Sequence, residues 1–264
     1  MTTLRSIGFA MASIVLMWAT LSAQSAEQQI VADASIALGG RDRIQAVKTL
    51  IVEGGGRDLN VGQSLRFDDL GLQSDVWQIR EYKRAYDLAN TRARFEAIRE
   101  AQYPFYQGEG TPRLIQGLDG DVAFNVNAEG NATRIFGGQA TGRLVEYLRH
   151  PLTLMRAALQ PTAKLSNART QGNERLVDIA TGAAMLTLAI DATTRLPTRI
   201  VQMTDSPTLG DTPVETRFAG YEAVSGLQLP TRLTTRTDRW LSADVRILRQ
   251  SVEDRKSTRL NSSH

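Results

Sequence analysis

Few side chains in this sequence are suited to catalysis or metal binding. The chain has two histidines, His150 and His264, and no cysteine. A zinc hydrolase site needs three or more His, Cys, Asp or Glu ligands that converge on the metal. The sequence therefore predicts no catalytic, cofactor-binding or metal-binding residue. Because His150 lies directly before Pro151, we predict that it has a structural role at a helix end, where its side chain favours the C-terminal carbonyls.

The other polar candidates lack the sequence context that catalysis requires. No serine lies in a G-x-S-x-G nucleophile elbow. The paired aspartates fall in a polar loop or on either side of a turn, so they are not predicted to act as general acid and base. Gly54-Gly55-Gly56 lacks the Lys-Ser/Thr of a phosphate-binding loop and predicts a bulge or a close backbone approach in a strand. The candidates weighed are Ser64, Ser166, Ser206, Asp68, Asp69, Asp119 and Asp121.

Aromatic residues gather between positions 77 and 106. We expect most of them to pack in the core or against a sheet face. A groove for a lipid or another apolar ligand is the alternative interpretation. The residues are Trp77, Tyr82, Tyr86, Phe95, Tyr103, Phe105 and Tyr106.

Both ends of the chain differ from its middle. Residues 1–26 contain one basic residue, then an apolar run at 7–21 and small residues before Ala23 and Ala26, which is typical of a secretory signal peptide. The apolar run is shorter than the roughly 20 residues that span a bilayer, which argues against a membrane-spanning helix. Residues 254–264 (D-R-K-S-T-R-L-N-S-S-H) resemble a translated sequencing adapter, so we expect a non-native tail. The domain proper is then 27–253.

The charge balance of the domain argues against nucleic acid as a partner. The chain has 31 Lys and Arg and 28 Asp and Glu residues. The signal peptide holds one of the basic residues, and the tail holds three basic residues and one acidic residue, so the domain itself is neutral. The basic surface expected of a nucleic-acid binder is therefore missing.

The apolar pattern predicts an α+β, mostly β fold: a curved antiparallel sheet meander covered by a few helices. Helices are expected at 28–47, interrupted by Gly39-Gly40, and as two short helices at 144–159, separated at Pro151. Asp119-Gly120 predicts a hairpin turn, and 127–131 a second turn. The expected strands are 50–56, 77–88, 91–102, 114–117, 122–126, 133–136, 175–179, 185–191, 198–204, 215–221, 229–237 and 243–248.

Four stretches resemble one known family. They are A-L-G-G-R-D-R-I-Q-A-V-K-T-L (37–50), N-V-G-Q (60–63), L-G-D-T-P-V-E-T (209–216) and Y-E-A-V-S-G-L-Q-L-P-T-R (221–232). Together they resemble the N-terminal region of exported bacterial metallo-β-lactamase (MBL)-fold hydrolases, where a β-rich region precedes the metal-binding domain. The family's H-x-H-x-D-H ligands match no position here. The order of helices and strands also resembles the lipoprotein-carrier fold, a curved sheet wrapped over helices.

The resemblance implies a truncated fragment: a non-catalytic accessory domain of a secreted hydrolase. Its partner would be the missing C-terminal hydrolase domain, where zinc is expected; no cofactor is expected in this chain. The alternative is a free-standing periplasmic carrier or binding protein for a lipid or another apolar small molecule. An enzyme that uses Asp or Ser residues is a further alternative. Both main interpretations imply a periplasmic or secreted protein without a stable membrane anchor after signal cleavage.

Overall fold

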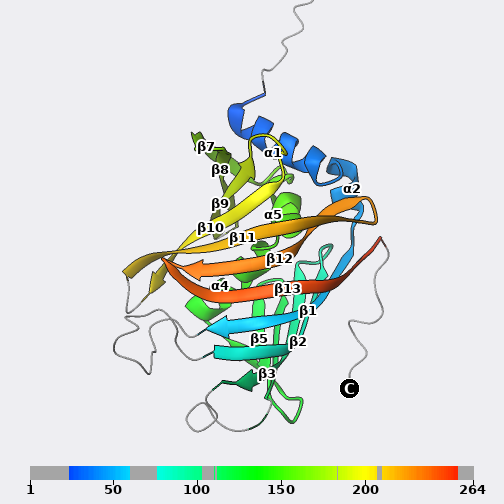
Figure 1. Cartoon of the computed structure of the whole chain (residues 1–264), viewed down its shortest axis with the longest axis vertical. Helices are drawn as coiled ribbons and strands as arrows, with labels where there is room; N and C mark the ends of the chain where they lie inside the picture. The colour runs from blue at the N-terminus through cyan, green and yellow to red at the C-terminus, as the bar shows by residue number, and fades with distance from the viewer. Residues whose placement is uncertain are drawn as a thin grey trace, which may run out of the picture.

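The fold is described from a computed structural model, which covers residues 24–59, 76–102, 110, 112–182, 184–206 and 210–254. These residues form a 13-stranded antiparallel sheet with the strand order β6-β5-β4-β3-β2-β1-β13-β12-β11-β10-β9-β8-β7. Two meanders thus meet where β1 (Thr49–Leu59) pairs with β13 (Trp240–Glu253) (Figure 1). The pairing of the first and last strands makes one continuous sheet out of two halves that are distant in sequence.

The remaining strands follow the chain in simple up-and-down order. On one side of β1 lie β2 (Val76–Asp87), β3 (Arg92–Ala101), β4 (Arg113–Asp119), β5 (Val122–Val126) and β6 (Ala132–Ile135). On the other side of β13 lie β12 (Leu227–Thr237), β11 (Gly210–Val224), β10 (Pro197–Ser206), β9 (Ala184–Asp191), β8 (Glu174–Thr181) and β7 (Lys164–Gln171).

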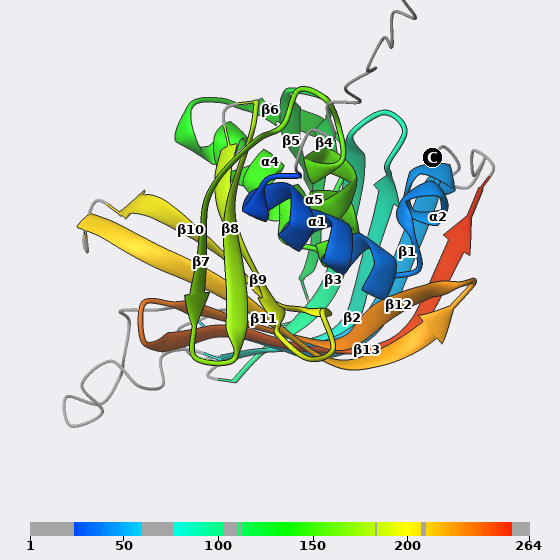
Figure 2. The same cartoon turned by 90° about the horizontal axis from the view of Figure 1, so that it is seen from above.

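Helices cover the concave face of this curved sheet (Figure 2). They are α1 (Ala26–Ala37), α2 (Arg41–Ala46), α4 (Gly138–Leu148) and α5 (Pro151–Ala158). The apolar side chains of α5 are almost wholly buried and, with those of β8 and β9, form the centre of the core. Removing these side chains from water is the main stabilising contribution to the fold. The fully buried examples are Leu152, Leu154, Met155, Val177, Leu188 and Ile190.

Two arginines bind α2 and α5 to each other. Arg156, on α5, donates hydrogen bonds to the carbonyl oxygens of Gln45 at 2.7 Å and Val47 at 2.8 Å, where α2 ends. Arg41, the first residue of α2, donates to the carbonyl oxygen of Leu159 at 3.2 Å, where α5 ends. The last carbonyls of a helix have no partner within the helix, so each helix supplies a cation to the open end of the other.

Helix α1 is bound to the sheet through a buried acid. Asp33 is 5% exposed and accepts a 2.5 Å hydrogen bond from Arg175 on β8. Gln29, one turn earlier, donates to the same carboxylate at 2.8 Å. The helix begins at Ala26 with Ser25 as its N-cap, so the expected domain boundary at residue 27 falls inside its first turn.

The Gly54-Gly55-Gly56 segment lies where β1 approaches β13, as the sequence predicted. The register of β1 shifts there against both neighbours. A Cβ atom on Gly54 would lie 2.1 Å from the carbonyl oxygen of Arg246, and one on Gly56 would lie 2.1 Å from that of Asp244. Glycine is therefore required sterically at these two positions of the central seam.

The predicted fold class is confirmed, and so are the interruption at Gly39-Gly40, the helix break at Pro151 and the hairpin at Asp119-Gly120. One strand was missed. Strand β7 (K-L-S-N-A-R-T-Q) is the polar edge of the sheet, and most of its side chains are exposed. An edge strand whose two faces are both exposed to solvent lacks the alternation of apolar and polar residues from which strands are predicted. Of the expected adapter-like tail, the described residues include Asp254, which pairs with Arg43 at 2.6 Å.

We expect Gly54→Ala to lower the free energy of unfolding by about 2–3 kcal/mol, because the added methyl group overlaps a backbone carbonyl that cannot move freely. Gly142→Ala, in α4, is the matched control: no atom lies within 4 Å of the place that its new Cβ would take, and the helix gains about 0.5–1 kcal/mol. Urea denaturation of both variants gives the values. Equal effects of the two substitutions would contradict the steric argument.

Arg156→Met should lower the free energy of unfolding by about 2 kcal/mol, because the α2 carbonyls lose charge-assisted hydrogen bonds. Arg92→Met provides the comparison, since Arg92 forms an ion pair with Asp119 in which both side chains are more than half exposed. Such pairs contribute about 0–1 kcal/mol. Thermal denaturation, followed by circular dichroism, measures the stability of both variants. A loss of stability in Arg156→Met no larger than that in Arg92→Met would refute the capping role.

Candidate functional site

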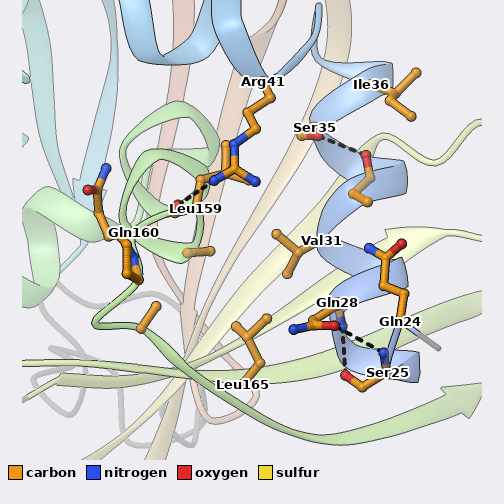
Figure 3. A pocket seen from close by; sticks show the side chains of 14 residues that line it. Gln24, Ser25, Gln28, Val31, Ser35, Ile36, Arg41, Leu159, Gln160 and Leu165 are labelled. Atoms are coloured by element: carbon orange, nitrogen blue, oxygen red, sulfur yellow. Dashed lines mark hydrogen bonds between the residues drawn. The ribbon is translucent and has the colours of Figure 1, made fainter. Parts of the chain in front are cut away.

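Two sizeable cavities lie beside the helices, and the larger is the weaker candidate. It has a volume of about 810 Å³ and lies between α1 and the segment that joins α5 to β7 (Figure 3). Its polar side chains are bonded to the protein itself: Arg41 to Leu159 at 3.2 Å, Ser35 to the carbonyl oxygen of Ala32 at 2.8 Å, and Gln28 to Ser25 in the capping box. Among the residues described, the lining of this cavity also contains no aromatic side chain, so it offers an apolar ligand less contact area than an aromatic wall would.

The second cavity, about 340 Å³, lies inside the concave face of the sheet, beneath the C-terminal end of α4. We call it the concave cavity. Its volume is at the lower end of the range for small-molecule sites. One part of its wall is aromatic and aliphatic, which suits an apolar ligand. This part comprises Tyr82, Tyr86, Phe95, Leu114, Leu233, Ala243 and Val245.

A charged cluster forms the other part of the wall. Arg84 on β2 donates a 2.5 Å hydrogen bond to Glu146 on α4, and its guanidinium carbon lies 4.8 Å from the centre of the Phe95 ring. Arg143, one turn before Glu146 on α4, does not line the cavity but also donates to Glu146, at 3.3 Å. Burial opposes ionisation of Glu146, but the guanidinium groups of Arg84 and Arg143 hold the pKa of its carboxyl below its usual value.

Arg149 brings a further cation to this wall. Its Nε donates to Gln202 on β10 at 3.2 Å, and no acidic side chain of the described residues lies within ion-pair distance of it. Burial lowers the pKa of this guanidinium, although arginine stays charged at neutral pH. The cluster of Arg84, Arg143, Arg149 and Glu146 therefore carries excess positive charge.

Asp58, near the end of β1, is an acid that lines the same cavity. Within the described residues its carboxylate has no hydrogen-bond or ion-pair partner. Burial raises the pKa of the Asp58 carboxyl to about 6, and the positive charge of Arg99 opposes this rise. A buried acid with a raised pKa beside a cavity is a common feature of functional sites.

His150 has a structural role, but its side chain caps the start of α5 rather than the C-terminal carbonyls of a helix. It is 3% exposed and is the N-cap of α5, where its Nδ1 accepts a 3.2 Å hydrogen bond from the backbone of Leu152. Burial, with a contribution from Arg84, lowers the pKa of its imidazole to about 3. A neutral imidazole that accepts from a helix N-terminus shows that His150 belongs to the helix that follows it.

The other candidates from the sequence do not meet at one place. Asp119 and Asp121 flank the β4–β5 turn, Ser166 is exposed on β7, and Ser206 ends β10. Ser64, Asp68, Asp69, Tyr103, Phe105 and Tyr106 lie outside the described residues. Of the aromatic residues, Tyr82, Tyr86 and Phe95 line the concave cavity. Among the described residues, no group of three or more His, Cys, Asp or Glu side chains is placed to hold a metal ion.

Sequence reasoning missed Arg84, Glu146, Arg149 and Asp58. A pattern does mark Arg84, because alternate residues of a strand face the same side. Tyr82 and Tyr86 are buried on the concave face, so an arginine between them faces the protein interior. No comparable pattern marks Asp58, which follows the register shifts in β1.

A scan against protein-family models finds no match, and neither does a search of curated proteins. Among solved structures, the chain matches a LolA superfamily protein from Nitrosomonas europaea with a TM-score of 0.50 and 10% identity, over 87% of this chain and 94% of that chain. A DUF1329 family protein from Desulfovibrio piger matches with a TM-score of 0.46 and 10% identity, over 88% of this chain and 95% of that one. LprF from Mycobacterium bovis matches with a TM-score of 0.29 and 9% identity, over 85% and 92%. The first match shows the fold, which is lipoprotein-carrier-like; the lower TM-scores of the other two add no support.

The expectation of an accessory domain of an MBL-fold hydrolase is wrong. The sheet and helices align with nearly the whole of a LolA superfamily chain, so this architecture exists without an attached hydrolase domain. Two of the stretches that carried the resemblance contact each other: Gln228 donates to the carbonyl oxygen of Leu38 at 3.0 Å, and Arg43 to that of Ser225 at 2.7 Å. These contacts hold the α1–α2 turn against the β11–β12 turn, so the two stretches have a structural role within this domain.

Asp58→Asn should stabilise the protein in a pH-dependent way. The pKa of Asp58 is about 6 in the folded state and about 3.9 in an unfolded chain, so the folded state holds the proton more tightly. The free energy of unfolding therefore falls as the pH rises from about 4 through 6. Removing the charge should raise the free energy of unfolding by about 1–2 kcal/mol at pH 8, a value that allows for water in the cavity. At pH 4 it should change the free energy of unfolding by almost nothing.

Chemical denaturation at pH 4, 6 and 8 measures this difference. Asp121→Asn, at an exposed turn position, controls for the substitution itself. A stabilisation of Asp58→Asn that is the same at all three pH values would show that the buried charge is not its cause.

Proposed function

We propose that this protein is a free-standing carrier or binding protein for a lipid or a similar apolar ligand, and that the ligand occupies the concave cavity. The observation that carries the proposal is the cavity itself: an apolar wall of sheet residues faces a wall of convergent polar and charged groups. This combination is the usual composition of a ligand site. The lipoprotein-carrier-like fold supports the same function by analogy.

Periplasmic or extracellular location is part of the proposal. The signal-peptide pattern of residues 1–26 supports it, although residues 1–23 lie outside the described part of the chain. No helix among the described residues is long and apolar enough to cross a membrane. The proposed partner is thus an apolar small molecule rather than another domain of the same chain.

Native mass spectrometry of protein from the periplasm tests this function. We expect a fraction of the protein to carry a bound lipid that organic extraction removes. Ala243→Phe should abolish this adduct, because Ala243 lines the cavity on β13 and a phenyl group there takes up the space. Ala219→Phe, on the exposed face of β11, should keep it.

Circular dichroism establishes that both variants are folded. Loss of the adduct in both variants, or retention in both, would place the ligand elsewhere. Absence of any adduct, together with no binding of an added apolar fluorophore by the extracted protein, would contradict the carrier function.

A further inference from the structure

We infer that the concave cavity selects single-chain amphiphiles with an anionic head group, which Arg149 and Arg84 hold at the α4 end of the cavity. This inference rests on the proposed function and names its ligand class. The first argument is the separation of apolar and charged walls. A ligand with a chain along the aromatic wall and a polar end at α4 would meet both.

The charge of the polar wall favours an anion. Arg84 and Arg149 line this wall with one partnered acid, Glu146, and Arg143, which is not a lining residue, is also bonded to Glu146. Glu146 is shared between Arg84 and Arg143, and Arg149 has a glutamine as its partner. At neutral pH the ionised Asp58 balances the charges of the lining residues, and a positive excess remains because Arg143 is bonded to Glu146 beside them. Guanidinium groups bind carboxylate, phosphate and sulfonate oxygens through several parallel donors.

Unused donors mark the place of the head group. Among the described residues, the buried Nε of Arg84 has no hydrogen-bond partner. A buried donor without a partner is costly, and an acceptor on a bound ligand would relieve this cost at Arg84, which lines the cavity. Arg149 is bonded to Gln202 through its Nε alone among the described residues, which leaves its terminal nitrogens for the ligand.

The cavity volume of about 340 Å³ favours one short chain over a multi-chain lipid. Its wall also includes hydroxyl groups on the sheet. The hydroxyls of Thr216 and Thr235 lie 3.0 Å apart and are bonded to each other, which uses one of their two O–H donors, and a neutral hydroxyl binds an anion less strongly than a guanidinium group does. The head group is thus assigned to the α4 side.

Isothermal titration calorimetry at pH 8 tests the inference with three probes of equal chain length: dodecane-1-sulfonate, dodecan-1-ol and dodecyltrimethylammonium, all below their micelle concentrations. The sulfonate is permanently charged, so its own titration does not enter. We expect it to bind about tenfold more tightly than the alcohol, and the cation to bind most weakly. Methanesulfonate, the head group without a chain, should not bind.

Arg149→Met should bring the affinity for the sulfonate down to that for the alcohol, and Arg149→Lys should keep part of the preference. Arg249→Met is the matched control, because the Arg249 side chain is 79% exposed on β13. This variant should keep the full preference for the sulfonate over the alcohol. Arg84 is not substituted alone, since the half-buried Glu146 would lose its closest partner. Near-UV circular dichroism verifies that each variant is folded.

The outcomes separate the inference from the proposed function. If sulfonate and alcohol bind equally well, or if Arg149→Met keeps the preference, the head-group assignment is wrong and the carrier function stands. If neither chain-bearing probe binds, the carrier function itself fails. Binding of methanesulfonate as tight as that of the long sulfonate would identify an anion site instead.

Asp58 adds a second readout. Because its carboxylate lines the same cavity, it repels the anion when ionised. Burial raises the pKa of this carboxyl to about 6; Arg99 and Arg84 oppose the rise, and Glu146 adds to it. Affinity for the sulfonate should rise several-fold from pH 8 to pH 5, whereas affinity for the alcohol should not change. Asp58→Asn should bind the sulfonate equally at both pH values. A pH effect of the same size in Asp58→Asn would refute this role.

Discussion

One face of a single antiparallel sheet must be shielded from water, and this requirement governs the rest of the structure. The sheet curves until its concave face surrounds the helices, and the pairing of β1 with β13 closes the two meanders into one surface. Glycines at 54 and 56 are needed because the backbones of these two strands approach too closely for a side chain. The helices then supply the apolar contacts that no second sheet provides.

The same geometry produces the concave cavity. Helix α5 packs against β8 and the other three helices and is buried on nearly all sides, whereas α4 contacts the sheet with a mixed face. Val145 and Leu148 of α4 are buried, but Glu146 and Arg149 border open space. A helix that covers a curved sheet incompletely leaves room for a ligand, and charges that would otherwise be solvated become part of the cavity wall.

The fold could be read from the sequence where a pattern is local. Alternation in 77–88 and the turns at Asp119-Gly120 and Pro151 depend on neighbouring residues, and they were predicted correctly. The polar cluster was not predicted, because Arg143, Glu146 and Arg149 follow helical spacing and read as a solvated face. Whether such a face meets water or a cavity depends on the curvature of a sheet whose strands are distant in sequence. The missed strand β7 has the same cause: its pairing with β8, rather than its own composition, makes it a strand.

Photo-crosslinking tests the central claim most directly, because it reports where the ligand lies. The purified protein is loaded with a single-chain fatty acid that carries a diazirine in its chain, irradiated, digested and analysed by mass spectrometry. The account predicts adducts on the strands that line the concave cavity, at residues such as Tyr82, Phe95, Leu233 and Val245, and their loss in Ala243→Phe. Adducts confined to α1 and the α5–β7 segment, around Val31 and Leu165, would contradict it and transfer the function to the larger cavity.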